Sequence, residues 1–160
     1  MNRPSGGVPS LVNIHEAIDD MIFLNQTLFK ERKIEVVKNY APDITSIFAI
    51  DDQIKQVLLN LIQNAEEAIP ETGGRITLST QINGENIIIK IQDTGQGIPP
   101  DIINSIFEPF FTTKPAVKGT GLGLSVSYGI IKKHGGNIEV DSIPGGETTF
   151  TITLPIKRKI

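Results

Sequence analysis

Two glycine clusters in the C-terminal half of the chain carry the residues best suited to chemistry. The first, Asp93–Ile98, reads Asp-Thr-Gly-Gln-Gly-Ile and places a carboxylate ahead of two glycines. The second, Gly119–Leu124, reads Gly-Thr-Gly-Leu-Gly-Leu and follows a phenylalanine-rich segment that contains Lys114. Glycine lets a backbone approach a ligand closely, and a lysine neutralises charge that develops on phosphate groups. Together these residues predict a pocket for an anionic nucleotide.

The second glycine cluster is the candidate phosphate site. The chain contains no Gly-x-x-x-x-Gly-Lys-Ser/Thr sequence, and this cluster does not follow a predicted strand, so neither a P-loop nor a dinucleotide-binding fold fits. A helix is predicted to begin directly after Gly121, where free backbone N–H groups and the helix dipole favour an anion. On its own such a cluster is more often a helix cap or a loop hinge, so the prediction of a triphosphate site depends on the other motifs.

The elements that must position these clusters follow from hydrophobic periodicity. A long helix is predicted from Asp51, a suitable N-cap, to just before Pro70. Its apolar residues form one arc, and a narrow polar arc beside it is available to a ligand and holds Gln56, Asn60, Gln63, Asn64 and Glu67. Other helical segments are expected at residues 11–31, 101–107 and 122–133. Strands are predicted at residues 34–37, 47–50, 75–82, 86–92, 137–142 and 148–154.

Composition bounds the class of protein. The chain has 160 residues, of which 39% are hydrophobic, and this is enough for one domain with a sizeable core. We assign a leader or junction segment to residues 1–10, the domain to residues 11–156 and a basic tail to residues 157–160. The net charge of −3 does not support nucleic-acid binding. Without cysteine or a membrane-spanning apolar run, we expect a soluble, cytoplasmic domain that makes no membrane contact.

The sequence Asn60-Leu61-Ile62-Gln63-Asn64-Ala65 and the segment Phe107–Lys114 complete a recognisable order of motifs. In this order the chain closely resembles the catalytic, ATP-binding domain of sensor histidine kinases, from about Val12 to Pro155. The resemblance implies an α/β fold of the Bergerat type: an α+β two-layer sandwich whose mixed, mostly antiparallel sheet is covered on one face by helices. It also implies that the glycine-rich residues 94–121 form an ATP lid.

The resemblance assigns the base-binding side of the pocket. In the family the aspartate of Asp-x-Gly-x-Gly accepts a hydrogen bond from the adenine amino group, and Asp93 matches that position. Gly95 and Gly97 would keep the wall beside the base free of side chains, while Ile98 would pack against the purine. Thr149 is similar to a threonine that helps to order this contact. From the residues alone, Asp93 reads more simply as a turn residue, and Thr149 nearly as well as an ordinary strand residue.

The resemblance also assigns the phosphate and metal side. Asn60 and Asn64 match the family's asparagine box, and the amide oxygen of Asn64 suits Mg²⁺, with Asn60 in support. Lys114 and Asn60 are the residues expected to act on the transferred phosphoryl group. Phosphate contacts are expected at Gly119, Gly121, Leu122 and Gly123.

The chain departs from the family in one respect. Several members carry a lysine and an aromatic residue three and four positions after the second asparagine, where this chain has Glu67 and Ala68. Phosphate neutralisation is then expected to rest more on Lys114 and Lys118.

The implied function is transfer of the γ-phosphoryl group of Mg-ATP to a histidine on a separate dimerisation and phosphoacceptor domain. A response regulator is expected to be the indirect partner. The isolated domain is expected to be monomeric, and the parent kinase is expected to be a homodimer. Anchoring of the parent in a membrane is compatible with this expectation. Neither His15 nor His134 is expected to accept the phosphoryl group. His15 lies at the start of the first predicted helix, and the proline that usually follows the family's acceptor histidine is absent after it.

Two alternatives share this fold. The first is an ATPase module of the gyrase, mismatch-repair or heat-shock chaperone kind, in which a glutamate four residues before the magnesium asparagine activates water. Asn60 occupies that position here. The second is a non-catalytic nucleotide-binding module, against which the complete set of motifs argues.

Overall fold

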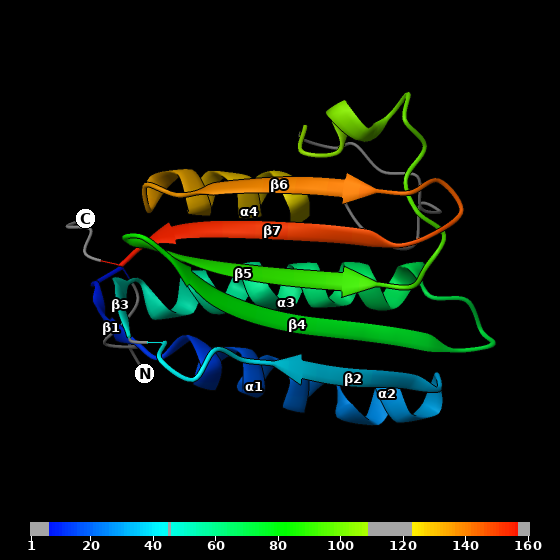
Figure 1. The fold of residues 1–160 in the computed structure, drawn as a ribbon, viewed down its shortest axis with the longest axis horizontal. Coiled ribbons are helices and arrows are strands. Elements are labelled where there is room, and N and C mark those ends of the chain that lie inside the picture. Colours follow the sequence, from blue (N-terminus) through cyan, green and yellow to red (C-terminus); the bar gives the residue numbers. More distant parts are fainter. Residues whose placement is uncertain (1–6, 45, 109–122, 157–160) are drawn as a thin grey trace.

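The computed structural model describes residues 7–44, 46–108 and 123–156. Figure 1 shows a five-stranded sheet in the order β2–β4–β5–β7–β6. β2 runs parallel to β4, and the other neighbouring pairs of this sheet are antiparallel. A separate two-stranded sheet joins β1 (Ser10–Val12) to β3 (Ile47–Ala49). The five strands of the main sheet are β2 (Ile34–Asn39), β4 (Gly74–Asn83), β5 (Asn86–Asp93), β6 (Asn137–Ser142) and β7 (Thr148–Pro155).

Helices cover one face of the sheet. These are α1 (Ile14–Leu24), α3 (Asp51–Ala68) and α4 (Gly123–Lys133), with the short α2 (Gln26–Glu31) following α1 (Figure 1). Alternation along β5 buries Ile87, Ile89 and Ile91 beneath these helices. The predicted apolar arc of α3 meets them and is buried at Ile54, Val57, Leu58, Leu61, Ile62 and Ala65. The predicted two-layer sandwich with a mixed, mostly antiparallel sheet is confirmed.

Residues 11–31 differ from the predicted single helix. Asn13 is the N-cap of α1, and its side chain accepts a hydrogen bond from the Glu16 N–H at 3.0 Å. The helix therefore begins at Ile14, and the residues before Asn13 form β1. α1 and α2 are separated at Asn25, whose buried side chain donates to the Met21 carbonyl at 2.8 Å. Such local hydrogen bonds compete with a continuous helical ladder. Two asparagines therefore replace one helix by a strand and two helices.

The predicted long helix is confirmed as α3, but the predicted N-cap, Asp51, is wrong. Ile50 is the N-cap, and Asp51 is the first helical residue, where its carboxylate forms an ion pair with Lys55 at 3.3 Å. A carboxylate in the first turn still opposes the positive end of the helix dipole. The Ile50 N–H donates instead to Nε2 of the buried His134 at 3.1 Å, which ties the end of α4 to the start of α3.

The segment after β5 leads into the predicted lid. Its described part holds one short 3₁₀ helix, Ile103–Ser105, within the predicted helical turn. Phe107 packs against the core, with its ring 5.5 Å from that of Tyr128 and 6.2 Å from that of Phe150. No helix among the described residues combines the length and the apolar character needed to cross a bilayer.

Candidate nucleotide site

Asp93 is a buried carboxylate at the end of β5, with 2% of its surface exposed. Its Oδ1 accepts a hydrogen bond from the Gly95 N–H at 2.8 Å, which closes the turn after the strand. Burial raises the pKa of the Asp93 carboxyl to about 6, against the lowering effect of the Gly95 hydrogen bond and with a further raising contribution from the charge of Glu147. A carboxylate held in this way favours a ligand that brings its own N–H donor.

The two glycines after Asp93 are needed for backbone packing. A side chain on Gly95 would start 2.5 Å from the Ala68 carbonyl oxygen, so this loop rests directly on the C-terminus of α3. Gly97 has φ of +76°, and a side chain there would collide with the Ile143 carbonyl oxygen in the β6–β7 turn. The expectation that both glycines keep the wall beside the base free of side chains stays a prediction. In the structure the two glycines let the loop approach α3 and β6 closely.

A hydroxyl network fixes the next residue of the loop. The Ile98 N–H donates to Ser142 Oγ at 2.7 Å, and Ser142 Oγ lies 2.8 Å from Thr148 Oγ1 in a shared hydrogen bond. Ile98 packs against the edge of the hydrophobic core. The loop that carries Ile98 is thus tied to the ends of both β6 and β7.

The strand register corrects the threonine predicted beside Asp93. Thr148 is the cross-strand partner of Asp93 and is buried, whereas Thr149 pairs with Gln92. Because successive residues of a strand point to opposite faces, Thr149 lies on the open face of the sheet, away from Asp93. Thr148 could have been identified from the sequence only if the register between β5 and β7 had been known.

Asn60 joins α3 to the beginning of α4. Its Nδ2 donates to the Gly123 carbonyl oxygen and to Oγ of the fully buried Ser127, each at 3.2 Å. With Nδ2 directed at these two acceptors, Oδ1 is left facing away from them as a further acceptor. Ser127 had no distinctive signal in the sequence, because a serine within an amphipathic helix is common.

α3 connects the two halves of the candidate site. Asn64 lies one turn beyond Asn60 on the same half-buried side of the helix, and Ala68, against which Gly95 packs, lies one turn further. Asn60, Asn64 and the Asp93–Gly95 turn therefore follow one another along the side of α3 that meets α4 and the loop. Five residues with a predicted role in the site, namely Lys114, Lys118, Gly119, Gly121 and Leu122, lie outside the described residues.

The donor set fits a magnesium ion carried by a nucleotide. The described residues contain no group of three or more His, Cys, Asp or Glu side chains that could hold a metal by themselves. Mg²⁺ commonly takes one or two oxygens from the protein and the rest from water and phosphates. The side-chain oxygen of an asparagine on α3 is suited to be one of these protein ligands.

Comparison with known proteins places the chain in a family. Residues 49–158 match the model of the histidine kinase-, DNA gyrase B- and HSP90-like ATPases. The chain belongs to this family. Similar curated proteins include sensor kinase CckA of Brucella abortus (strain 2308), at 40% identity over 92% of the chain and 17% of CckA. The sensory histidine kinase/phosphatase NtrB of Azospirillum brasilense is 39% identical over 91% of the chain and 39% of NtrB. The chain thus spans well under half the length of these family members.

Solved structures of the family share the fold. The nucleotide-free catalytic domain of histidine kinase ThkA superposes with a TM-score of 0.84 at 31% identity, covering 93% of this chain and 96% of that one. Full-length ShkA in complex with AMPPNP gives a TM-score of 0.81 at 27% identity, covering 92% and 31%. ThkA in complex with the response regulator protein TrrA gives 0.79 at 30% identity, covering 92% and 42%.

Proposed function

We propose that this chain binds Mg-ATP and donates its γ-phosphoryl group to a histidine on a separate domain of a sensor kinase. The buried carboxylate of Asp93 carries the proposal. It lies at the end of a central strand, held by the Gly95 N–H, beside a loop that α3, β6 and β7 fix in place. The adenine amino group is a donor that such a carboxylate accepts, and a charge-assisted hydrogen bond of this kind is stronger than a neutral one.

We assign the phosphates to the other end of the candidate site, where Asn60 on α3 meets the start of α4. The Asn60 side chain fixes the start of α4 against α3, and the first N–H groups of a helix are a ready-made site for phosphate. Asn64 is the proposed protein ligand of Mg²⁺, which when bound would neutralise charge on the β- and γ-phosphates. We assign charge neutralisation at the γ-phosphate to Lys114 and backbone contacts to Gly119, Gly121 and Leu122.

Positioning is sufficient for this chemistry, so the chain needs no nucleophile of its own. The two histidines are also engaged elsewhere. His134 is buried, its Nδ1 donating to the Ile130 carbonyl at 2.8 Å while its Nε2 accepts from Ile50. His15 is hydrogen-bonded through Nε2 to Thr80 Oγ1 at 2.7 Å and stacks on the Tyr40 ring at 4.2 Å. The acceptor is therefore proposed to lie on another domain.

The partners follow from the same proposal. The phosphoacceptor domain of the parent kinase receives the phosphoryl group, and a response regulator receives it in turn. The complex of ThkA with the response regulator protein TrrA supports the second partner by analogy within the family.

Phosphotransfer to a separate domain is the direct test. The chain is incubated with magnesium and γ-labelled ATP, with and without the histidine-bearing domain of its parent kinase. We expect acid-labile label on that domain and none on the chain alone. Label that stays on the isolated chain and disappears in His15→Ala would refute the proposal.

An ATPase of the same family is the second candidate. In it, a glutamate four residues before the magnesium asparagine would activate water. Here that position is Asn60, an amide that is not a general base near neutral pH and is already bonded to Gly123 and Ser127. The structure of this residue therefore favours the kinase over the ATPase.

A further inference from the structure

The side-chain amide of Asn60 is held between α3 and α4 by two acceptors. Its Nδ2 lies 3.2 Å from the Gly123 carbonyl oxygen and 3.2 Å from Ser127 Oγ. Gly123 and Ser127 are four residues apart in α4, so the two acceptors lie one turn apart on the same side of that helix. An amide NH2 group has two donors, and two protein acceptors are enough to satisfy both of them.

These contacts decide which way the Asn60 amide faces. If the amide were turned over, Oδ1 would lie against the Gly123 carbonyl oxygen, and two acceptors at that distance repel each other. The amide nitrogen is therefore directed at α4. Asn60 is only half-buried, and Oδ1 is the polar atom that its side chain can offer to a ligand.

The fold holds the two acceptors with different firmness. Gly123 is the exposed first residue of α4, and helix ends fray. Ser127 lies in the second turn of α4, with 0% of its surface exposed. A buried hydroxyl requires a hydrogen-bond partner, which the Asn60 amide supplies. Ser127 is therefore the firmer of the two anchors for the amide.

We propose that Ser127 is a positioning residue for magnesium binding, which holds the Asn60 amide so that Oδ1, rather than Nδ2, faces the nucleotide. An amide oxygen suits a Mg²⁺ ion or accepts a hydrogen bond from water bound to that ion. It does not suit a phosphate oxygen, which is also an acceptor. Asn60 is thus assigned to the hydrated cation and not to direct contact with the γ-phosphate.

This inference rests on the proposed binding of Mg-ATP and deepens it. It gives a role in the site to a residue that is fully buried and so does not touch the nucleotide itself. It also explains why the start of α4 and the asparagines of α3 work as one unit, because Asn60 bonds to both turns of α4 that lie beside it.

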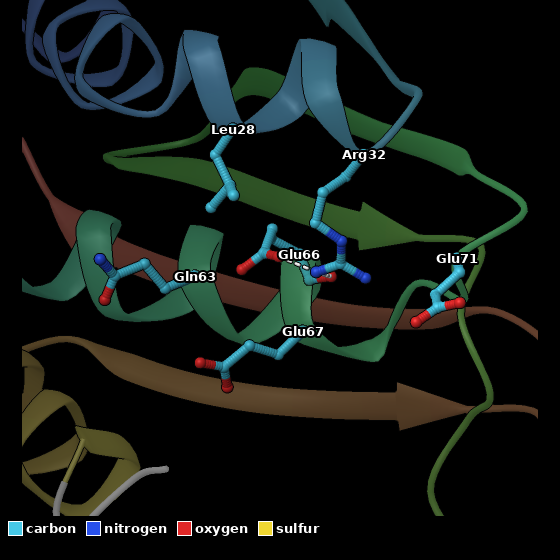
Figure 2. Close-up of a pocket in the computed structure, with 6 residues that line it drawn as sticks. All are labelled: Leu28, Arg32, Gln63, Glu66, Glu67 and Glu71. Atoms are coloured by element: carbon cyan, nitrogen blue, oxygen red, sulfur yellow. Dashed lines mark hydrogen bonds and ion pairs between the residues drawn. The ribbon is translucent and has the colours of Figure 1, made fainter.

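Hydrogen exchange of the Asn60 side-chain amide tests the contact without any nucleotide. Its NMR signals in the whole, isotope-labelled chain are identified as the pair that is absent from Asn60→Ala. We expect Ser127→Ala to speed their exchange with water at least about fivefold, because a protecting hydrogen bond is lost. The exposed amide of Gln63, which lines the hollow between α2 and α3, is the internal reference (Figure 2). Unchanged exchange at Asn60 would overturn the proposal.

The magnesium dependence of ATP binding tests the consequence. Affinity for ATP is measured by calorimetry with magnesium and with excess chelator. We expect Ser127→Ala to reduce the gain in affinity that magnesium gives by about tenfold, as is common when a residue that supports a metal site is removed. Ser79→Ala, the same substitution at a half-buried position of β4, is the matched control and should keep the full gain.

A double-mutant cycle shows whether Ser127 acts through Asn60. In the Asn60→Ala background, Ser127→Ala should cause no further loss of the magnesium-dependent gain. Additive losses would overturn the proposal. A lower melting temperature of Ser127→Ala with unchanged magnesium dependence would also overturn it, because Ser127 would then only pack the interface of α3 and α4.

The same titrations separate this inference from the proposed function. If magnesium gave the unmodified chain no gain in ATP affinity, both the proposed function and the inference would be contradicted. If the unmodified chain showed the gain and Ser127→Ala kept it in full, only the role of Ser127 would be contradicted.

Discussion

Asp93 and Thr148 are cross-strand partners on the buried face of the sheet, where β5 ends and β7 begins. Thr148 is bonded through Ser142 to the Ile98 N–H, and Asp93 is bonded to the Gly95 N–H. The carboxylate and the loop around it are thus anchored to three strands. This gives Asp93 a fixed direction, which a residue in a free turn would lack.

The buried state of Asp93 predicts how stability depends on pH. Its pKa of about 6 in the folded chain lies above the ordinary aspartate value, so between about pH 4 and pH 6 the folded state holds more protons than the unfolded state. The free energy of unfolding should therefore fall as pH rises through this window, by on the order of 2 kcal/mol relative to Asp93→Asn. Denaturant titrations of both proteins at several pH values measure the difference. Parallel pH profiles would show that Asp93 is not the group responsible.

Asn64→Ala should separate binding from stability. Asn64 lies half-buried on the side of α3 that faces α4, where removing an amide costs little packing. We expect a change in unfolding free energy below about 1 kcal/mol but at least a tenfold loss of the magnesium-dependent part of ATP binding. Gln63→Ala, an exposed neighbour, is the matched control. A large fall in melting temperature with unchanged nucleotide affinity would instead make Asn64 a structural residue.

The ion pair between Arg32 and Glu66 should be far more important to stability than a surface pair. Glu66 is buried, and the Arg32 guanidinium also donates to the Glu66 and Ile69 carbonyls at the end of α3. Arg32→Ala leaves a buried charge unpaired and should cost about 3–5 kcal/mol. Arg75→Ala removes the exposed pair with Glu35, at 3.0 Å, and should cost less than about 1 kcal/mol. Equal losses, measured by chemical denaturation, would contradict the role given to Arg32.

Steady-state hydrolysis of ATP by the isolated chain should be slow. The position of the water-activating glutamate is occupied by Asn60, whose side chain bridges α3 and α4. We expect turnover well below about 1 s⁻¹ in a phosphate-release assay, even at saturating ATP. Turnover at or above that rate would favour the ATPase alternative.

Much of the fold could be predicted because its signals are local. The apolar arc of α3 and the alternation in β5 appear in the sequence as periods of 3.6 and 2, and both elements formed within a few residues of their predicted bounds. The break at Asn25 could not be predicted, because it depends on which backbone carbonyl a short polar side chain finds after folding.

The candidate site shows the same limit. Thr148 rather than Thr149 faces Asp93 because of a register between distant strands, which no local pattern fixes. The two glycines were identified, but the contacts that require them, with Ala68 and Ile143, exist only in the tertiary structure.

The most direct test of the account is a calorimetric titration of the chain with Mg-ATP and with Mg-GTP. Asp93 accepts a hydrogen bond, which suits the amino group of adenine and opposes the carbonyl of guanine. We expect ATP to bind at least tenfold more tightly than GTP, and Asp93→Asn to lose about 1.5–3 kcal/mol of ATP binding. Asp141→Asn, an exposed aspartate on β6, should bind ATP as the unmodified chain does. Equal affinity for ATP and GTP in the unmodified chain would contradict the assignment of Asp93 as the residue that recognises adenine.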